Sequence, residues 1–119
     1  MQIYRGDTFK FDFSATLEGS NELHTFEEGD ILKAAIKSNV KDNNYILFQE
    51  KEIDVPTNEV TFEFTHTETI KIPLKKEAIL EVELTNVSGK VSTLYQEEIE
   101  IVGDVIDEWK NNWENKSST

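Results

Sequence analysis

Apolar and polar residues alternate along most of this chain, and the alternation is clearest over residues 8–17, which read TFKFDFSATL. The apolar side chains of this stretch occupy every second position: Phe9, Phe11, Phe13, Ala15 and Leu17. A period of two places them on one face of a β-strand. Three phenylalanines on one face form a surface that a lone hairpin does not bury, so we expect a second sheet to cover it.

The same alternation, interrupted by turn-forming residues, predicts further strands. A short lead-in strand over residues 2–5 ends at a Gly6-Asp7 turn. The remaining predicted strands are Ile31–Lys37, residues 45–55, Val60–Phe64, Ala78–Thr85 and Val91–Val102. About seven or eight strands joined by short turns indicate an all-β domain over residues 1–103, folded as an antiparallel β-sandwich.

Two of these strands carry finer predictions. In residues 45–55 the side chains expected to face the core are Ile46, Phe48, Ile53 and Val55. The change of phase between the two pairs predicts a β-bulge near residues 50–52. In Ala78–Thr85 the inward side chains are Ala78, Leu80, Val82 and Leu84, and the outward ones are Ile79, Glu81 and Glu83.

Two connecting segments also have predictable features. Residues 18–30 are polar and contain glycine, which indicates a loop, with Leu23 and Phe26 as a hydrophobic plug. Further on, Thr65 is expected to cap a single helical turn over His66–Thr69, with Glu68 in the capping-box position.

After Gly103 the apolar spacing becomes helical, with apolar residues recurring every four positions. Asp104 suits an N-cap, so we predict an α-helix over residues 104–116 and a disordered tail over residues 117–119. Its tryptophans leave two alternatives open: the helix folds back onto its own sandwich, or its aromatic face meets another subunit. The candidate protein-interface residues are Val105, Ile106, Trp109 and Trp113.

The charge balance restricts the partners. The chain has 24 acidic and 12 basic residues, a formal net charge of −12, and such a surface repels nucleic-acid backbones. The absence of cysteine excludes a disulfide framework and a thiolate zinc site. We expect no membrane span and no signal peptide, because no stretch has the required run of apolar residues.

The sequence contains no recognisable catalytic motif, so we expect no enzyme. The two histidines, His24 and His66, lie in separate turn regions without metal-ligand spacing. No nucleophile elbow, P-loop or dinucleotide-binding motif is present. The acidic cluster around residues 97–108 lacks the spacing of an EF-hand loop. We therefore expect no metal, no cofactor and no small-molecule ligand.

The order of motifs resembles a group of virion proteins. A short strand leads into Arg5-Gly6-Asp7-Thr8 and an aromatic alternating strand, a Phe-x-Phe-Thr strand follows at residues 62–65, and the last hairpin runs from residues 91–94 to Gly103-Asp104-Val105. Over residues 3–105 the chain resembles the small β-sandwich of tailed-phage virion proteins, especially the N-terminal domain of siphophage baseplate upper proteins and related prophage structural proteins.

The resemblance implies a sandwich without catalytic role that anchors onto a central tail or baseplate ring, followed by a helix that drives oligomerisation. Residues 5–8 would form a structural turn, and residues 104–116 would begin that helix. The chain departs from the pattern at Lys75-Lys76-Glu77, where a glycine-aromatic pair is usual, and we expect no receptor-binding module after the helix. We therefore expect a phage or prophage structural or assembly protein, a baseplate, tail or neck component of the virion assembled in the bacterial host cytoplasm. Its partners would be other virion proteins or further copies of itself.

A second function class stays open on the charge alone. A small acidic phage-encoded inhibitor could cover a basic, nucleic-acid-binding site of a host protein by charge mimicry. The salt dependence of binding distinguishes the assembly protein from the inhibitor. Charged contacts are screened over about 10 Å at 0.1 M salt, whereas an apolar interface is not.

Overall fold

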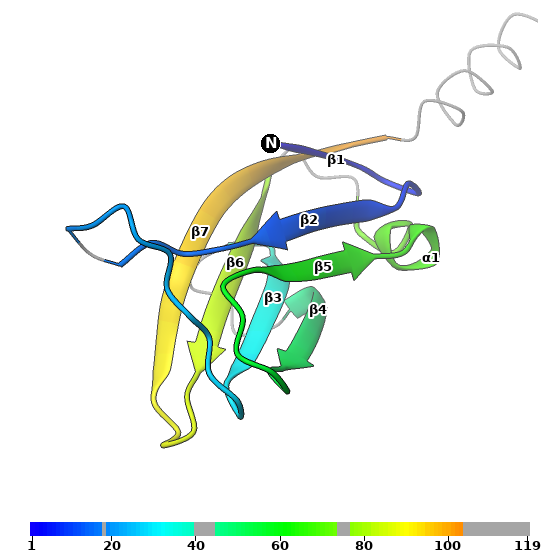
Figure 1. Ribbon diagram of the computed structural model, residues 1–119. Helices are drawn as coiled ribbons and strands as arrows, with labels where there is room; N and C mark the ends of the chain where they lie inside the picture. Colours follow the sequence, from blue (N-terminus) through cyan, green and yellow to red (C-terminus); the bar gives the residue numbers. More distant parts are fainter. Residues whose placement is uncertain (18, 40–44, 74–76, 104–119) are drawn as a thin grey trace, which may run out of the picture.

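Seven strands and one short helix make up the described part of the chain, which in this computed structural model covers residues 1–17, 19–39, 45–73 and 77–103 (Figure 1). The elements are β1 (Gln2–Tyr4), β2 (Phe9–Phe13), β3 (Ile31–Lys37), β4 (Tyr45–Glu52), β5 (Val60–Phe64), α1 (His66–Thr69), β6 (Ala78–Thr85) and β7 (Val91–Val102). The all-β prediction is confirmed. The predicted helix over residues 104–116 and the tail over residues 117–119 lie outside the described residues.

The strands form two sheets of unequal size. The larger is curled, in the order β1-β7-β6-β3-β4, and the smaller pairs β2 with β5. In the larger sheet, β7, β6, β3 and β4 pair antiparallel with their neighbours, but β1 runs parallel to β7, with Ile3 opposite Ile101. The expectation of a purely antiparallel arrangement is therefore wrong at β1. The physical reason is that β1 and β7 are the first and last strands, so no short hairpin turn fixes their relative direction.

The core lies between the two sheets, and Figure 1 shows β6 and β7 curving around β2 and β5. Its buried side chains are Ile3, Phe13, Phe26, Leu32, Ala34, Ile36, Ile53, Val60, Phe62, Phe64, Ile72, Ala78, Leu80, Val82, Ile99 and Ile101. The predicted inward face is confirmed in β5 and for Ala78, Leu80 and Val82 in β6. In β2, Phe13 is buried while Phe9 and Phe11 pack partly against the core. The strand ends at Phe13, short of the predicted residue 17.

Strand β4 differs most from its prediction. Its register with β3 shifts where Ile36 pairs with Leu47 and Lys37 pairs with Tyr45, so Ile46 is the extra residue of a bulge. The bulge therefore lies at the start of the strand and not near residues 50–52. With this register Phe48 stands on the outer face, 54% exposed, and the expectation that it is buried is wrong. Val55, also expected in the core, is 74% exposed.

The loop between β2 and β3 confirms one half of the predicted plug. Phe26 is fully buried and its backbone pairs with Thr57 in both directions, at 2.7 and 3.1 Å. Leu23 is 45% exposed, so it is not part of the plug. Of the two predicted plug residues, Phe26 alone is buried.

The predicted helical turn is confirmed, and it holds the first turn of the chain in place. The Thr65 N–H donates to the Glu68 carboxylate at 3.0 Å, which is the capping-box contact. The buried Thr69 hydroxyl donates to the Asp7 carbonyl at 2.7 Å and accepts from the Gly6 N–H at 3.1 Å. Residues 5–8 thus form a structural turn, in which Gly6 has a φ of 93°.

Candidate functional site: the outer face of the larger sheet

Charged and aromatic side chains gather on the face of the larger sheet that points away from the core. Ala35, at the centre of β3, lies opposite Phe48 on one side and Glu81 on the other. Because alternate residues share a face, this register brings side chains from β3, β4, β6 and β7 together. We call them the outer-face cluster: Lys33, Lys37, Tyr45, Phe48, Glu81, Glu83 and Gln96.

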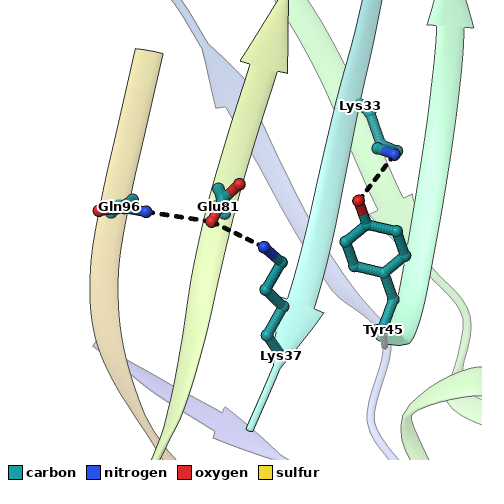
Figure 2. Close-up of polar contacts among 5 residues, drawn as sticks. All are labelled: Lys33, Lys37, Tyr45, Glu81 and Gln96. Atoms are coloured by element: carbon teal, nitrogen blue, oxygen red, sulfur yellow. Dashed lines mark hydrogen bonds and ion pairs between the residues drawn. The ribbon is translucent and has the colours of Figure 1, made fainter. Parts of the chain in front are cut away.

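A buried ion pair lies within the outer-face cluster (Figure 2). Lys37 Nζ is 3.2 Å from Glu81 Oε2, and the two side chains are only 7% and 5% exposed. The Gln96 amide donates a further hydrogen bond of 3.1 Å to the same carboxylate oxygen. Each charge is therefore matched by a partner, and no buried side-chain nitrogen or oxygen of the described residues lacks one.

A bulge in β7 is responsible for the position of Gln96. Val82 pairs with Tyr95 and Glu83 pairs with Thr93, so Leu94 is the extra residue. The inserted residue reverses the phase of the strand beyond it. Tyr95 turns toward the core side, where its ring centroid lies 6.1 Å from that of Phe13, and Gln96 turns toward Glu81.

An aromatic pair with a lysine occupies the β4 side of the outer-face cluster. The Lys33 ammonium donates to the Tyr45 hydroxyl at 2.9 Å and lies 4.4 Å from the centroid of the tyrosine ring. This hydrogen bond raises the pKa of Lys33, against the opposing effect of burial. The Phe48 ring packs against Tyr45 with centroids 5.7 Å apart. A large aromatic side chain thus stays in solvent, held in place by its neighbours.

The two glutamates of β6 titrate as a pair. The hydrogen bond with Glu81, together with burial and the negative charge of Glu81, raises the pKa of Glu83. Burial also raises the pKa of Glu81, but hydrogen bonds from Glu83, Gln96 and Lys37 outweigh it and bring the pKa below its usual value. The two carboxyl groups therefore titrate together, with the pKa of Glu83 shifted up and that of Glu81 shifted down.

We expect Glu83→Gln to stabilise the fold at neutral pH. A group whose pKa is raised by folding stabilises the native state below its unfolded pKa, about 4.3 for glutamate, and loses that contribution as the pH rises through the folded value. A glutamine amide donates to Glu81 at every pH, so the gain at pH 7 is about 0.5–1.5 kcal/mol, the net worth of one hydrogen bond. Urea denaturation at neutral and acid pH measures it.

The matched control for this prediction is Glu98→Gln, an exposed glutamate on the neighbouring strand β7. It removes the same charge without touching Glu81. A gain from Glu83→Gln that persists unchanged in acid, or that Glu98→Gln reproduces, would contradict the raised pKa of Glu83.

The residues proposed from sequence for a site are largely elsewhere. The candidate interface residues Val105, Ile106, Trp109 and Trp113 lie outside the described residues. His24 packs edge-on to Phe26, with centroids 5.2 Å apart, and His66 is exposed in α1. In the part of the chain that the structure describes, no group of three or more histidines and carboxylates has a geometry that could hold a metal ion. The same ranges contain no helix long and apolar enough to cross a membrane.

Sequence reasoning missed the outer-face cluster. Glu81 and Lys37 occupy polar phases of alternating strands, which usually face solvent. Their pairing depends on the β3–β6 register and on the bulge at Leu94, which no local pattern reveals. The position of Glu81 between Leu80 and Val82 is the only local signal.

Comparison with known proteins does not identify a function. No protein-family model matches the chain, and no curated protein matches it. The function is therefore inferred from the chemistry of the outer-face cluster. Its ion pair between Lys37 and Glu81 is closed within the cluster, while Phe48, 54% exposed, is accessible to another molecule. This arrangement suits adhesion to a protein surface.

Proposed function

We propose that this chain is a non-enzymatic structural or assembly protein of a phage or prophage particle, a baseplate, tail or neck component that acts through protein–protein contacts. The observation that supports it best is the exposed Phe48, 54% accessible and packed against Tyr45 on the outer face of edge strand β4. Aromatic residues are enriched at the centres of protein interfaces. The proposal that the protein belongs to a phage particle rests on the order of motifs, which resembles that of tailed-phage virion proteins.

The proposal also includes a β-sandwich architecture and a second contact region, in residues 104–116. The two sheets act as a β-sandwich, and residues 104–116 form a helix whose apolar side chains bind another subunit. The interface residues proposed there are Val105, Ile106, Trp109 and Trp113. Each tryptophan buries about 150–250 Å² in such a contact, and removing one costs roughly 2 kcal/mol or more.

Solution mass in low and high salt tests this proposal. The native chain is compared with Trp109→Ala/Trp113→Ala and with Phe48→Ser. We expect a salt-resistant oligomer of the native chain, because apolar contacts are not screened. The double tryptophan variant should be a folded monomer, and Phe48→Ser should weaken association by roughly tenfold or more, a loss of about 1.4 kcal/mol.

Val55→Ser is the matched control, since Val55 is 74% exposed but lies after β4 and off the outer-face cluster. Its mass should equal that of the native chain. A native chain that is monomeric at every salt concentration would reject self-assembly. Variants that all remain oligomeric would reject the proposed contact residues.

The acidic-inhibitor function stays as a second candidate because of one surface feature. Glu77, Glu98 and Glu100 line a hollow of about 530 Å³ together with Met1 and Ile99. Three carboxylates around one depression attract a basic protein surface. Under this function the chain is a monomer, and its complex with a basic partner dissociates steeply as salt rises.

A further inference from the structure

Among the residues that the structure describes, one edge of β2 has no strand beside it. β2 pairs with β5 from Phe9 opposite Phe64 to Phe13 opposite Val60, and within residues 1–17, 19–39, 45–73 and 77–103 no strand pairs with its other edge. Figure 1 shows β1 and β2 leaving the same turn and diverging toward the N-terminus. The open edge of β2 is therefore the one on the side of β1 (Figure 1).

A hollow of about 260 Å³, here called the gap, lies between β2 and strands β6 and β7. Its lining residues are Met1, Phe11, Asp12, Phe13, Ser14, Leu80 and Tyr95. Phe11 and Phe13 face the core, whereas the Asp12 carboxylate faces away from it and accepts a hydrogen bond from the Thr61 hydroxyl. Side chains on opposite faces of one strand line the same hollow only where it runs along the backbone edge. The hollow therefore gives access to unpaired main-chain groups.

The opposite wall of the hollow is apolar. Leu80 is fully buried beneath it, and Tyr95 is 36% exposed, with its ring 6.1 Å from that of Phe13. The bulge at Leu94 is what directs Tyr95 to this side of β7. The Tyr95 hydroxyl donates to Glu97, which also lies 3.8 Å from the N-terminal ammonium of Met1. An occupant would thus meet apolar rings inside the gap and a carboxylate at its rim.

The charge around the gap selects a basic occupant. Asp12 lines the gap, and the Glu97 carboxylate lies at its rim beside Tyr95, 3.8 Å from the Met1 ammonium. The whole chain carries a net charge of −12. A second copy of the chain, with the same charge, is repelled from this position, whereas a lysine-rich or arginine-rich segment is attracted.

We propose that the open edge of β2 binds an extended basic segment of a partner protein by strand addition. The segment lies between β2 and β7, forms main-chain hydrogen bonds with the edge of β2, and places alternate apolar side chains against Phe11 and Tyr95. Its basic side chains point toward the carboxylates at the rim. This inference rests on the proposed function in one respect: the partner is another component of the assembly. The contact is separate from the outer-face cluster.

A peptide titration of the isotopically labelled full chain tests this inference. The probe is the peptide acetyl-KVKVKVK-amide, followed by backbone amide shifts. We expect saturable shifts confined to β2 and to the part of β7 around Tyr95, with binding that weakens at least tenfold between about 0.05 M and about 0.5 M salt. Shifts on the outer-face cluster without shifts in β2 would overturn the proposal, and so would no binding at all.

Two controls separate strand addition from simple charge attraction. A peptide of the same sequence with N-methyl groups on two adjacent central residues keeps its charge but cannot pair along either edge, and it should bind at least tenfold more weakly. Equal binding of the two peptides would overturn strand addition. Among protein variants, Asp12→Lys, in the lining of the gap, should weaken binding, whereas Glu52→Lys, an equal charge change on the far edge strand β4, should leave it near the native value.

The outcome is independent of the test of the proposed function. Peptide binding by a chain that is monomeric at all salt concentrations would support strand addition and reject self-assembly. The native chain could instead form an oligomer that the tryptophan and Phe48 substitutions weaken, and fail to bind the peptide. That result would support the proposed function and reject the open edge of β2 as a binding site.

Discussion

Replacing Lys37 by methionine is expected to destabilise the fold by about 3–5 kcal/mol. The substitution leaves the Glu81 carboxylate, 5% exposed, without the ammonium that now lies 3.2 Å away. Gln96 still donates one hydrogen bond to that carboxylate, but an amide does not balance a buried negative charge. Urea denaturation at neutral pH measures the loss. Part of it should be recovered in acid, where Glu81 takes up a proton and the unpaired charge disappears.

Two further variants isolate the cause. Lys33→Met changes the same residue type on the same strand and face, but this ammonium is partly exposed, so the cost should stay within about 1 kcal/mol. Lys37→Met/Glu81→Leu removes both charges and should restore stability close to the native value or above it, because an apolar pair avoids the desolvation of two ions. A double variant as unstable as Lys37→Met alone would show that packing, and not charge, sets the cost.

Phe26→Ala is expected to cost about 3–5 kcal/mol, although Phe26 lies in a loop. Its side chain is fully buried, with its ring centroid 6.4 Å from that of Phe13 and 5.2 Å from that of His24. The loop cannot close the resulting cavity, because the Phe26 backbone is bonded to Thr57 in both directions. Thermal and urea unfolding measure the change.

Leu23→Ala in the same loop is the control. Leu23 is 45% exposed, and surface substitutions of this kind usually change stability by about 0.5 kcal/mol or less. Comparable losses from Phe26→Ala and Leu23→Ala would mean that both residues form the plug, as the sequence predicted, and would contradict the position of Leu23 in the structure.

The accuracy of the sequence prediction followed the source of each signal. Strands β3, β5, β6 and β7 were predicted to the residue, because turn residues mark their ends and inward apolar residues recur at alternate positions along at least part of each. The capped turn at α1 was also found, since a capping box involves residues only three positions apart. The face of Phe48 was predicted wrongly, because a bulge at Ile46 shifts the register and turns the side chain outward.

The sites were less predictable than the strands. The sequence directed attention to Trp109 and Trp113, which lie outside the described residues, and did not indicate that Lys37 and Glu81 form a buried pair. These two residues are 44 positions apart, and the bulge that brings Gln96 to them lies in a third strand. A local pattern carries no information on such a meeting. The open edge of β2 is equally invisible, because alternation shows which face is buried but not which edge is paired.

The sequence by itself therefore determined the all-β class, the bounds of the regular strands and the acidic surface, because periodicity, turn residues and charge are local or additive properties. Only the tertiary structure decided three other features. It placed β1 parallel to β7, it enclosed Lys37 and Glu81 on the outer face, and it left the β2 edge open beside Tyr95. Each of these depends on which distant strands become neighbours and in which register. That choice is made by burying one shared core, to which the whole chain contributes at once.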